Sequence, residues 1–291
     1  VGGPLVPERI RFGPAGKPVG MKSGDYVKAI EYVANEGLDA LEYEAVRGVR
    51  ISEKKAVEIK RAALEHGILL SMHAPYFINL ASPNEDTVKK SQQRLLDALK
   101  AANWMGAYVV VFHPGYYKDN PSKEAALKRV IENLKPVVEQ AKQLGIKGVE
   151  LGPETTGKRA QVGDIDEVIT ICREVEMCRP VVDWAHIYAR YRGQHVTSID
   201  QVLKVIEKIE KELGSRAVNP LHTHFSRIEY GEGGEREHHT LDEAEYGPEF
   251  RIVCEAYKQA GIRAVIISES PILDQDALKM KKICCEELGY C

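Results

Sequence analysis

The stretch "SEKKAVEIKRAALEHGILLSMH", residues 52–73, contains a helical pattern followed by a strand pattern. Apolar residues in its first part recur at spacings of three and four, which is typical of a helix with one buried face. Ser52 stands at the N-cap position, and Gly67 stands where the helix must end. The apolar run "ILLSMH" then predicts a buried strand over 68–73, ending at His73. The stretch therefore predicts one helix-and-strand unit of an α/β protein.

The same alternation recurs along the chain. Helical patterns also cover "DYVKAIEYVANEG" (25–37), with Gly37 as C-cap, and "SIDQVLKVIEKIEKELG" (198–214), with Ser198 as N-cap. Eight β-then-α units in 291 residues predict a (β/α)8 TIM barrel, whose active site lies at the carboxyl ends of the strands. A doubly wound open sheet is the alternative. The predicted strands are 9–13, 40–44, 68–73, 108–113, 148–152, 180–184, 221–225 and 264–269.

Composition bounds the class of protein. No linker or change of composition divides the chain, so we expect one domain over 1–291, with 1–8 set aside because such a segment is often partly added to the natural sequence. A net charge of −3 makes no overall polycation, so nucleic-acid binding would need a local surface or metal ions. The six cysteines form no CxxC pair and predict free thiols in a reducing compartment. Without a membrane span or a signal-peptide pattern, we expect a soluble, cytoplasmic protein.

Histidines and carboxylates close six successive predicted strands, from the third to the eighth. In a barrel these residues meet at one rim. Any one of them is more often a hydrogen-bond partner of a nearby loop than a ligand, but barrel folding does not require the whole set. Packed together without cations they would repel or shift their pKa values, whereas two or three divalent metal ions, with Glu154 shared between two, resolve the conflict. The residues are His73, His113, Glu154, Asp183, His186, His222 and Glu269.

The stretch "HTHFSRIEYGEGGEREHHT", residues 222–240, holds four of the nine histidines. We expect His222 to lie in the seventh strand and the following loop to return His238 to the same rim. His224 and His239 are equally compatible with binding a metal and with orienting neighbouring ligands.

Together the strand-end motifs resemble the endonuclease IV family, the apurinic/apyrimidinic endonucleases among the xylose isomerase-like TIM barrels. The likeness covers nearly the whole chain. It implies that His73, His113 and Glu154 hold one zinc, which Glu154 bridges to a second zinc held by Asp183, His222 and Glu269, and that His186 and His238 hold a third. It also implies that Tyr76 enters the DNA at the lesion, and Arg47 or Arg50 is a weaker match for a second inserted side chain. The motifs are "HAPYFINLASP" (73–83), "FHPG" (112–115), "ETTG" (154–157), "DWAH" (183–186) and "ESP" (269–271).

Two motifs depart from the family. Where the family has His-x-Asn-Asp after strand seven, this chain has "HTHF" (222–225). Where the family has Asp-Arg-His-His, this chain has "EREHH" (235–239), and matching "HHTL" to the family puts Arg236 at the place of the Asp ligand. A cation cannot bind zinc, so Glu235 or Glu237 would have to substitute, with either His238 or His239 as the partner ligand.

The resemblance implies a zinc-dependent enzyme, with manganese as an alternative metal, that cuts duplex DNA on the 5′ side of an abasic site during base excision repair. Glu154 and Glu269 are then expected to act in catalysis, damaged duplex DNA is the partner, and the protein is expected to be a monomer. The alternative is a sugar isomerase or epimerase with a single metal on Glu154, Asp183, His222 and Glu269, in which two glutamates serve as acid and base. A non-catalytic barrel would have no use for this ligand set.

Overall fold

Helices form where the sequence predicts amphipathic segments in the computed structural model, which describes residues 10–291. The Ser52 hydroxyl accepts a hydrogen bond from the backbone N–H of Lys55 at the start of α2, and Ser198 caps α7 in the same way. Gly37 and Gly67 end α1 and α2 with φ angles of 93° and 68°, which favour glycine. The helices are α1 Tyr26–Glu36, α2 Glu53–His66, α3 Glu85–Met105, α4 Lys123–Gln143, α5 Ile165–Glu174, α6 Trp184–Arg190, α7 Ile199–Leu213, α8 Phe250–Ala260 and α9 Leu273–Lys282, with short turns η1 Ser215–Val218 and η2 Ile283–Glu287.

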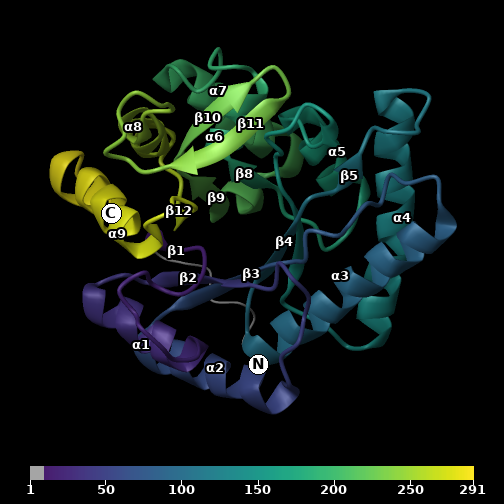
Figure 1. Ribbon diagram of the computed structural model, residues 1–291, viewed down its shortest axis with the longest axis horizontal. Coiled ribbons are helices and arrows are strands. Elements are labelled where there is room, and N and C mark those ends of the chain that lie inside the picture. The colour runs from purple at the N-terminus through teal and green to yellow at the C-terminus, as the bar shows by residue number, and fades with distance from the viewer. Residues whose placement is uncertain (1–9) are drawn as a thin grey trace.

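Eight parallel strands form the centre of the molecule, with the helices around them (Figure 1). Each predicted strand is confirmed to within two residues at either end, except that residue 9 of the first lies outside the described residues. Two four-stranded sheets are formed, in the orders β1-β12-β9-β8 and β2-β3-β4-β6. The strands are β1 Arg11–Pro14, β2 Ala40–Glu44, β3 Leu69–His73, β4 Val109–Phe112, β6 Glu150–Pro153, β8 Val181–Asp183, β9 Leu221–Phe225 and β12 Ala264–Ser268.

The two sheets close into one barrel. A parallel bridge between Ala15 and Glu42 joins β1 to β2, and another between Glu154 and Val181 joins β6 to β8. Gly13 permits the first contact, because a Cβ at this position would lie 1.7 Å from the carbonyl oxygen of Ala40. The predicted TIM barrel is confirmed, and the open-sheet alternative is wrong.

Apolar side chains fill the lower part of the barrel interior. Val109, Val111, Val181, Val265 and Ile267 are buried there in one small cluster. A larger cluster packs the helices against the outside of the strands. The ionisable residues at the carboxyl ends therefore lie above a packed, largely apolar barrel interior.

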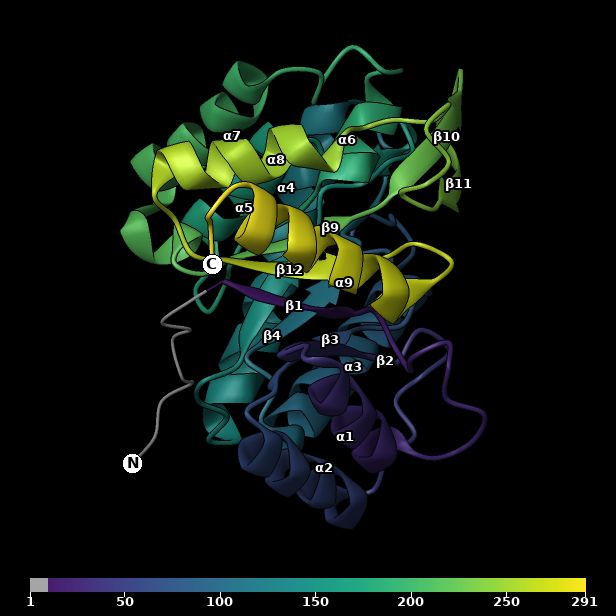
Figure 2. The same cartoon turned by 90° about the vertical axis from the view of Figure 1, so that its left-hand side faces the viewer.

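Four short strands outside the barrel shape its carboxyl end. β10 (Arg227–Gly231) and β11 (Gly234–His239) form an antiparallel hairpin where the sequence predicted a loop, and Figure 2 shows this hairpin at one edge of the molecule. β5 (Gly115–Tyr116) pairs with β7 (Gln161–Val162). A bridge between Lys158 and Gly234 fastens the hairpin to the loop after β6.

The cysteines depart from the prediction. Cys254 is bonded to Cys284 and Cys285 to Cys291, so the expectation of free thiols is wrong for these four, while Cys172 and Cys178 are free. The spacing of the cysteines along the chain does not predict these pairs. Cys254 lies in α8 and Cys284 in the C-terminal turn η2, and only the fold brings them together. The cysteines therefore lend no support to a cytoplasmic location, which stays a prediction. Within residues 10–291, no helix has the length and apolar character needed to span a membrane.

Candidate metal centre

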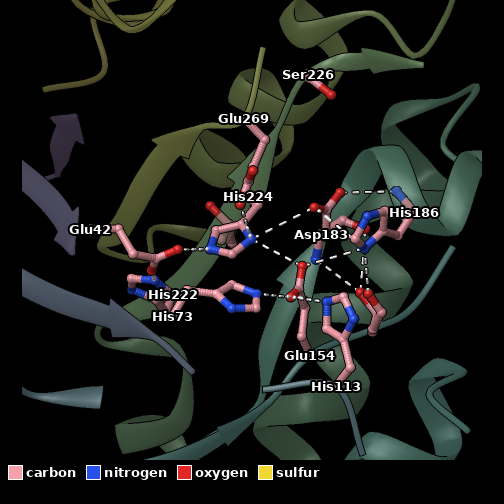
Figure 3. Close-up of polar contacts among 12 residues, drawn as sticks. Glu42, His73, His113, Glu154, Asp183, His186, His222, His224, Ser226 and Glu269 are labelled. Carbon is pink, nitrogen blue, oxygen red and sulfur yellow. Dashed lines mark hydrogen bonds and ion pairs between the residues drawn. The ribbon is translucent and has the colours of Figure 1, made fainter. Parts of the chain in front are cut away.

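The strand-end residues meet at one end of the barrel, as expected (Figure 3). His73 and Asp183 end β3 and β8, while His113, Glu154 and Glu269 directly follow β4, β6 and β12. Because alternate residues of a strand face the same side, these are the last inward-facing residues of their strands. Four of them line a cavity of about 420 Å³, and the fifth, Asp183, is fully buried. The other residues that line the cavity are Tyr76, Tyr116, Lys158, Gln161, His186, Glu235, Arg236 and His238.

Two histidines face one oxygen of Glu154. The Nε2 atoms of His73 and His113 lie 3.2 and 2.9 Å from Glu154 Oε1. His73 Nδ1 lies 2.8 Å from the carbonyl oxygen of Ala74, to which it donates a hydrogen bond. That bond leaves the lone pair on Nε2, the atom that faces Glu154. The three side chains form a group that could hold a metal ion.

The other oxygen of Glu154 faces a second group. His224 Nδ1 lies 3.0 Å from Glu154 Oε2, 3.2 Å from Glu269 Oε1 and 3.7 Å from Asp183 Oδ2. Asp183 Oδ2 is buried and has no hydrogen-bond partner among the described residues. A buried carboxylate oxygen without a partner is costly, and a metal ion at this point would satisfy it.

His222 was expected in this second group, and the structure places His224 there instead. Both side chains point into the barrel, but the strand register sets their depth: His224 is level with Asp183, whereas His222 is level with Val181 and Val265. The ring of His222 contacts Glu42 and the hydroxyl of Tyr108, below the cluster. The structure therefore brings His224, and not His222, beside Glu154, Asp183 and Glu269.

A third group joins α6 to the hairpin. His186 Nε2 lies 3.3 Å from Glu235 Oε2, and His238 Nε2 lies 3.8 Å from the same oxygen. His186 Nδ1 donates to the carbonyl oxygen of Thr155 at 2.8 Å, and the Ser226 hydroxyl lies 2.6 Å from His238 Nδ1. His186 Nδ1 also lies 3.3 Å from Glu154 Oε2. In both rings Nδ1 is held by another group while Nε2 faces Glu235, which is the usual arrangement of metal-binding histidines.

A β-bulge turns Glu235, rather than Glu237, toward His186 and His238. Glu229 pairs with Glu237 and Tyr230 with Glu235, so Arg236 has no partner across the hairpin. The extra residue reverses the side-chain alternation, and residues 235 and 238 come to face the same side. Glu237 is 71% exposed, and His239 stacks on Tyr246 with its Nδ1 atom 2.7 Å from Glu243. Glu237 and His239 therefore lie outside the cluster.

The matched neighbours Glu235 and Glu237 allow a direct comparison. We expect Glu235→Gln to remove about one metal ion per chain and Glu237→Gln to remove none, because only Glu235 faces His186 and His238. Elemental analysis after dialysis against a weak chelator measures both. Equal metal content in the two variants would contradict the assignment.

Residues 30–282 match the family described as xylose isomerase-like TIM barrels. The chain belongs to this family. Its sequence is 39% identical to that of "Uncharacterized protein MJ0133" of Methanocaldococcus jannaschii, over 95% of this chain and 97% of that protein. It is 29% identical to "Probable endonuclease 4" of Aquifex aeolicus, over 58% of this chain and 59% of that protein.

Two solved structures share this fold over most of the chain. Endonuclease IV from Thermus thermophilus superposes with a TM-score of 0.71 at 21% identity, over 95% of this chain and 99% of the other. A D-tagatose 3-epimerase-like protein superposes with a TM-score of 0.67 at 24% identity, over 91% and 95%. The resemblance to endonuclease IV is confirmed, and the fold is shared with epimerases.

The histidines and carboxylates around the cavity of this xylose isomerase-like barrel shift one another's pKa values. Burial opposes a charged His73, but the hydrogen bond to Glu154 and the charge of Glu44 outweigh it and raise the pKa of His73 to about 10. Burial also opposes ionisation of Glu235, but the adjacent His186 lowers the pKa of Glu235 to about 2. Without metal, the raised pKa values of His73, His186 and His224 favour their protonated forms, which balance the neighbouring carboxylates. The donor set therefore fits divalent metal ions, which would replace those protons.

Two inward-facing glutamates of β2, Glu42 and Glu44, were not predicted from the sequence. Glu42 contacts His222 and His224, and the pKa of the half-buried Glu44 is raised well above its usual value by removal of its carboxyl group from water and by neighbouring carboxylates. The signal was present: "ALEYE" puts acids at alternate positions of a predicted strand, and Glu44 ends that strand. Applying the strand-end rule to the second strand would have found Glu44.

Tyr76 lies at the rim of the cavity. Its side chain is 55% exposed, and its ring centroid lies 5.6 Å from that of His73 and 6.1 Å from that of His113. Arg47 and Arg50, which follow β2, are both exposed. The position of Tyr76 suits contact with a large ligand that approaches the metal-binding groups.

Proposed function

We propose that the protein is a metal-dependent apurinic/apyrimidinic endonuclease, which hydrolyses the phosphodiester bond 5′ to an abasic site in duplex DNA during base excision repair. One observation carries the proposal: three of the residue groups that could hold a metal ion meet beside one cavity, and Glu154 belongs to two of them. Several cations around one cavity suit a phosphodiester, which carries negative charge on its non-bridging oxygens and develops more on the leaving oxygen.

The chain's own residues would divide the work. His73, His113 and Glu154 would hold one ion, Glu154, Asp183, His224 and Glu269 a second, and His186, Glu235 and His238 a third. Bound zinc or manganese would stabilise the charge of the phosphate and lower the pKa of an attacking water. Glu154 would fix the spacing of two ions, because its two oxygens face different groups. Glu269 lines the cavity on the side opposite His113 and would contact the reacting phosphate.

The mouth of the cavity supports a DNA substrate. Lys158 and Arg236 line it, and no salt bridge is formed by either among the described residues. We expect them to supply the local positive charge that a chain with a net charge of −3 needs in order to bind a phosphate backbone. Tyr76 would fill the space left by the missing base, since turning a base-less sugar out of the duplex breaks no base pair.

A sugar epimerase is the second candidate. Glu154, Asp183, His224 and Glu269 by themselves could hold one ion, with two glutamates serving as acid and base, and an epimerase-like protein shares the fold. His73, His113 and the third group have no evident role in a single-metal site. Metal content separates the two candidates, because two or three zinc ions per chain support the nuclease and one tightly bound manganese supports the epimerase.

Cleavage of a duplex oligonucleotide tests the proposal. We expect the zinc- or manganese-loaded protein to cut a duplex with one abasic site, leaving a 3′-hydroxyl, and to leave the matched intact duplex uncut. Glu269→Gln should lower the rate about 100-fold or more, because it weakens one metal group next to the phosphate. A wild-type protein that does not cut, or a Glu269→Gln variant that cuts at the full rate, would refute it. Interconversion of ketohexoses by the same samples would favour the epimerase instead.

A further inference from the structure

A buried carboxylate lies directly below the metal-binding groups. Glu42, in the middle of β2, is fully buried, as are His222 and His224 of β9. One oxygen, Oε1, lies 2.8 Å from His222 Nε2 and 2.9 Å from the Ser71 hydroxyl. The other oxygen, Oε2, forms an ion pair with His224 Nε2 at 2.7 Å, at an angle that departs from that of a hydrogen bond, and neither atom has a hydrogen-bond partner among the described residues. Glu42 therefore connects the ligand candidate His224 to the deeper histidine (Figure 3).

With Glu42 ionised and each ring carrying a single proton, the contacts of this network favour one arrangement of protons. An ionised carboxylate only accepts hydrogen bonds, so the ring nitrogens that face Glu42 must carry protons. His222 thus carries its proton on Nε2, and its Nδ1 accepts from the hydroxyl of Tyr108. The Ser71 hydroxyl, which donates to Oε1, holds the carboxylate from a third side.

The ring of His224 is oriented by the same carboxylate. A proton on His224 Nε2, facing Glu42, leaves Nδ1 as the atom that offers a lone pair. Nδ1 is the atom that faces Glu154 and Glu269, at 3.0 and 3.2 Å. A histidine ligand is held in this way when a carboxylate takes the proton of its second nitrogen.

We propose that Glu42 is a positioning residue for the metal ligand His224, and that Ser71, His222 and Tyr108 hold Glu42 in place from inside the barrel. The proposal rests on the metal centre of the proposed function, but not on which reaction that centre performs. It explains why a carboxylate and a second histidine stand below the cluster at the level of Val181 and Val265, where the neighbouring inward side chains are apolar.

Metal affinity tests the role of Glu42. The protein is stripped of metal, and zinc is titrated back against a chromophoric chelator at fixed pH. We expect Glu42→Gln to weaken binding of about one ion per chain by roughly 10- to 100-fold, the usual effect of losing such a partner, while the other ions bind as in the wild type. The cobalt-loaded variant should also show a changed visible absorption spectrum, because the geometry at one ion changes.

Glu150→Gln is the matched control. Glu150 is also a carboxylate buried in a barrel strand, but it pairs with Arg179 and Arg216 at the amino-terminal end. If Glu42 acts only in folding, both variants should lose thermal stability without metal, and neither should lose zinc affinity. Should Glu42→Gln not fold, Ser71→Ala removes one support of the carboxylate and is expected to weaken the same ion about threefold.

The outcomes separate the two proposals. Wild-type zinc affinity at every ion in both Glu42→Gln and Ser71→Ala would overturn the role of Glu42 and leave the endonuclease proposal standing. A wild-type protein that binds no metal would overturn both. Weakened zinc binding in a protein that does not cut abasic DNA would support the role of Glu42 and contradict the endonuclease.

Discussion

Glu154→Gln is expected to abolish cleavage of abasic DNA, with a loss of about 1,000-fold or more, and to leave fewer than two metal ions per chain. Glu154 is the one carboxylate whose two oxygens face two different groups, with His73 and His113 on one side and His224 on the other. A glutamine offers a single neutral oxygen, so it cannot hold two cations. Loss of several kcal/mol of charge stabilisation corresponds to a rate loss of this size.

Single-turnover cleavage and elemental analysis of the same samples measure this effect. Glu150→Gln, four residues earlier in β6, is the control for damage to the strand itself. It should keep full metal content and near wild-type cleavage, whatever it costs in thermal stability. Retention of three ions by Glu154→Gln would show that the groups are held independently of this residue.

Metal removal should lower thermal stability, and by more at high pH than at low pH. An ion present at about 1,000 times its Kd stabilises the folded chain by about 4 kcal/mol, or roughly 10 °C for a protein of this size. The pKa of His73 is raised from 6.5 to about 10, so its protonated form stabilises the metal-free fold fully below pH 6.5, and this stabilisation is lost as the pH rises toward 10.

Metal binding is also expected to strengthen as the pH rises. His73, His186 and His224 all have raised pKa values in the metal-free protein, so each must release a proton before it can bind an ion. We expect the zinc-induced rise in melting temperature to be several degrees larger at pH 9 than at pH 6. Calorimetric scans with zinc and with chelator at both pH values test this. A larger rise at pH 6 would show that these imidazoles are not displaced by metal.

The barrel was predictable because its signals are local. The caps at Ser52 and Ser198 and the apolar runs between the helices each depend on neighbours in the chain, and the structure bears them out. Five strand-end residues, His73, His113, Glu154, Asp183 and Glu269, were found from the same local pattern. A parallel barrel brings the carboxyl ends of its strands together, so recognising the strands was enough to gather these residues.

The second histidine of the seventh strand was not predictable from the chain alone. His222 and His224 face the same side of β9, so alternation cannot choose between them. Only the register against β8 and β12 sets His224 level with Asp183 and sinks His222 to the level of Val181. Register is a property of strand pairs, and it is decided when the whole barrel closes.

The sequence by itself determined the barrel, the rim at which the ionisable residues meet and the residue types that suit divalent cations. Tertiary structure decided which of several equivalent side chains enters each group. The bulge at Arg236 turned Glu235 toward His186, and the packing of β2 against β9 placed Glu42 behind His224. The physical reason is that patterning along a strand fixes the face on which a side chain lies, whereas its depth and its partners depend on contacts between segments far apart in the chain.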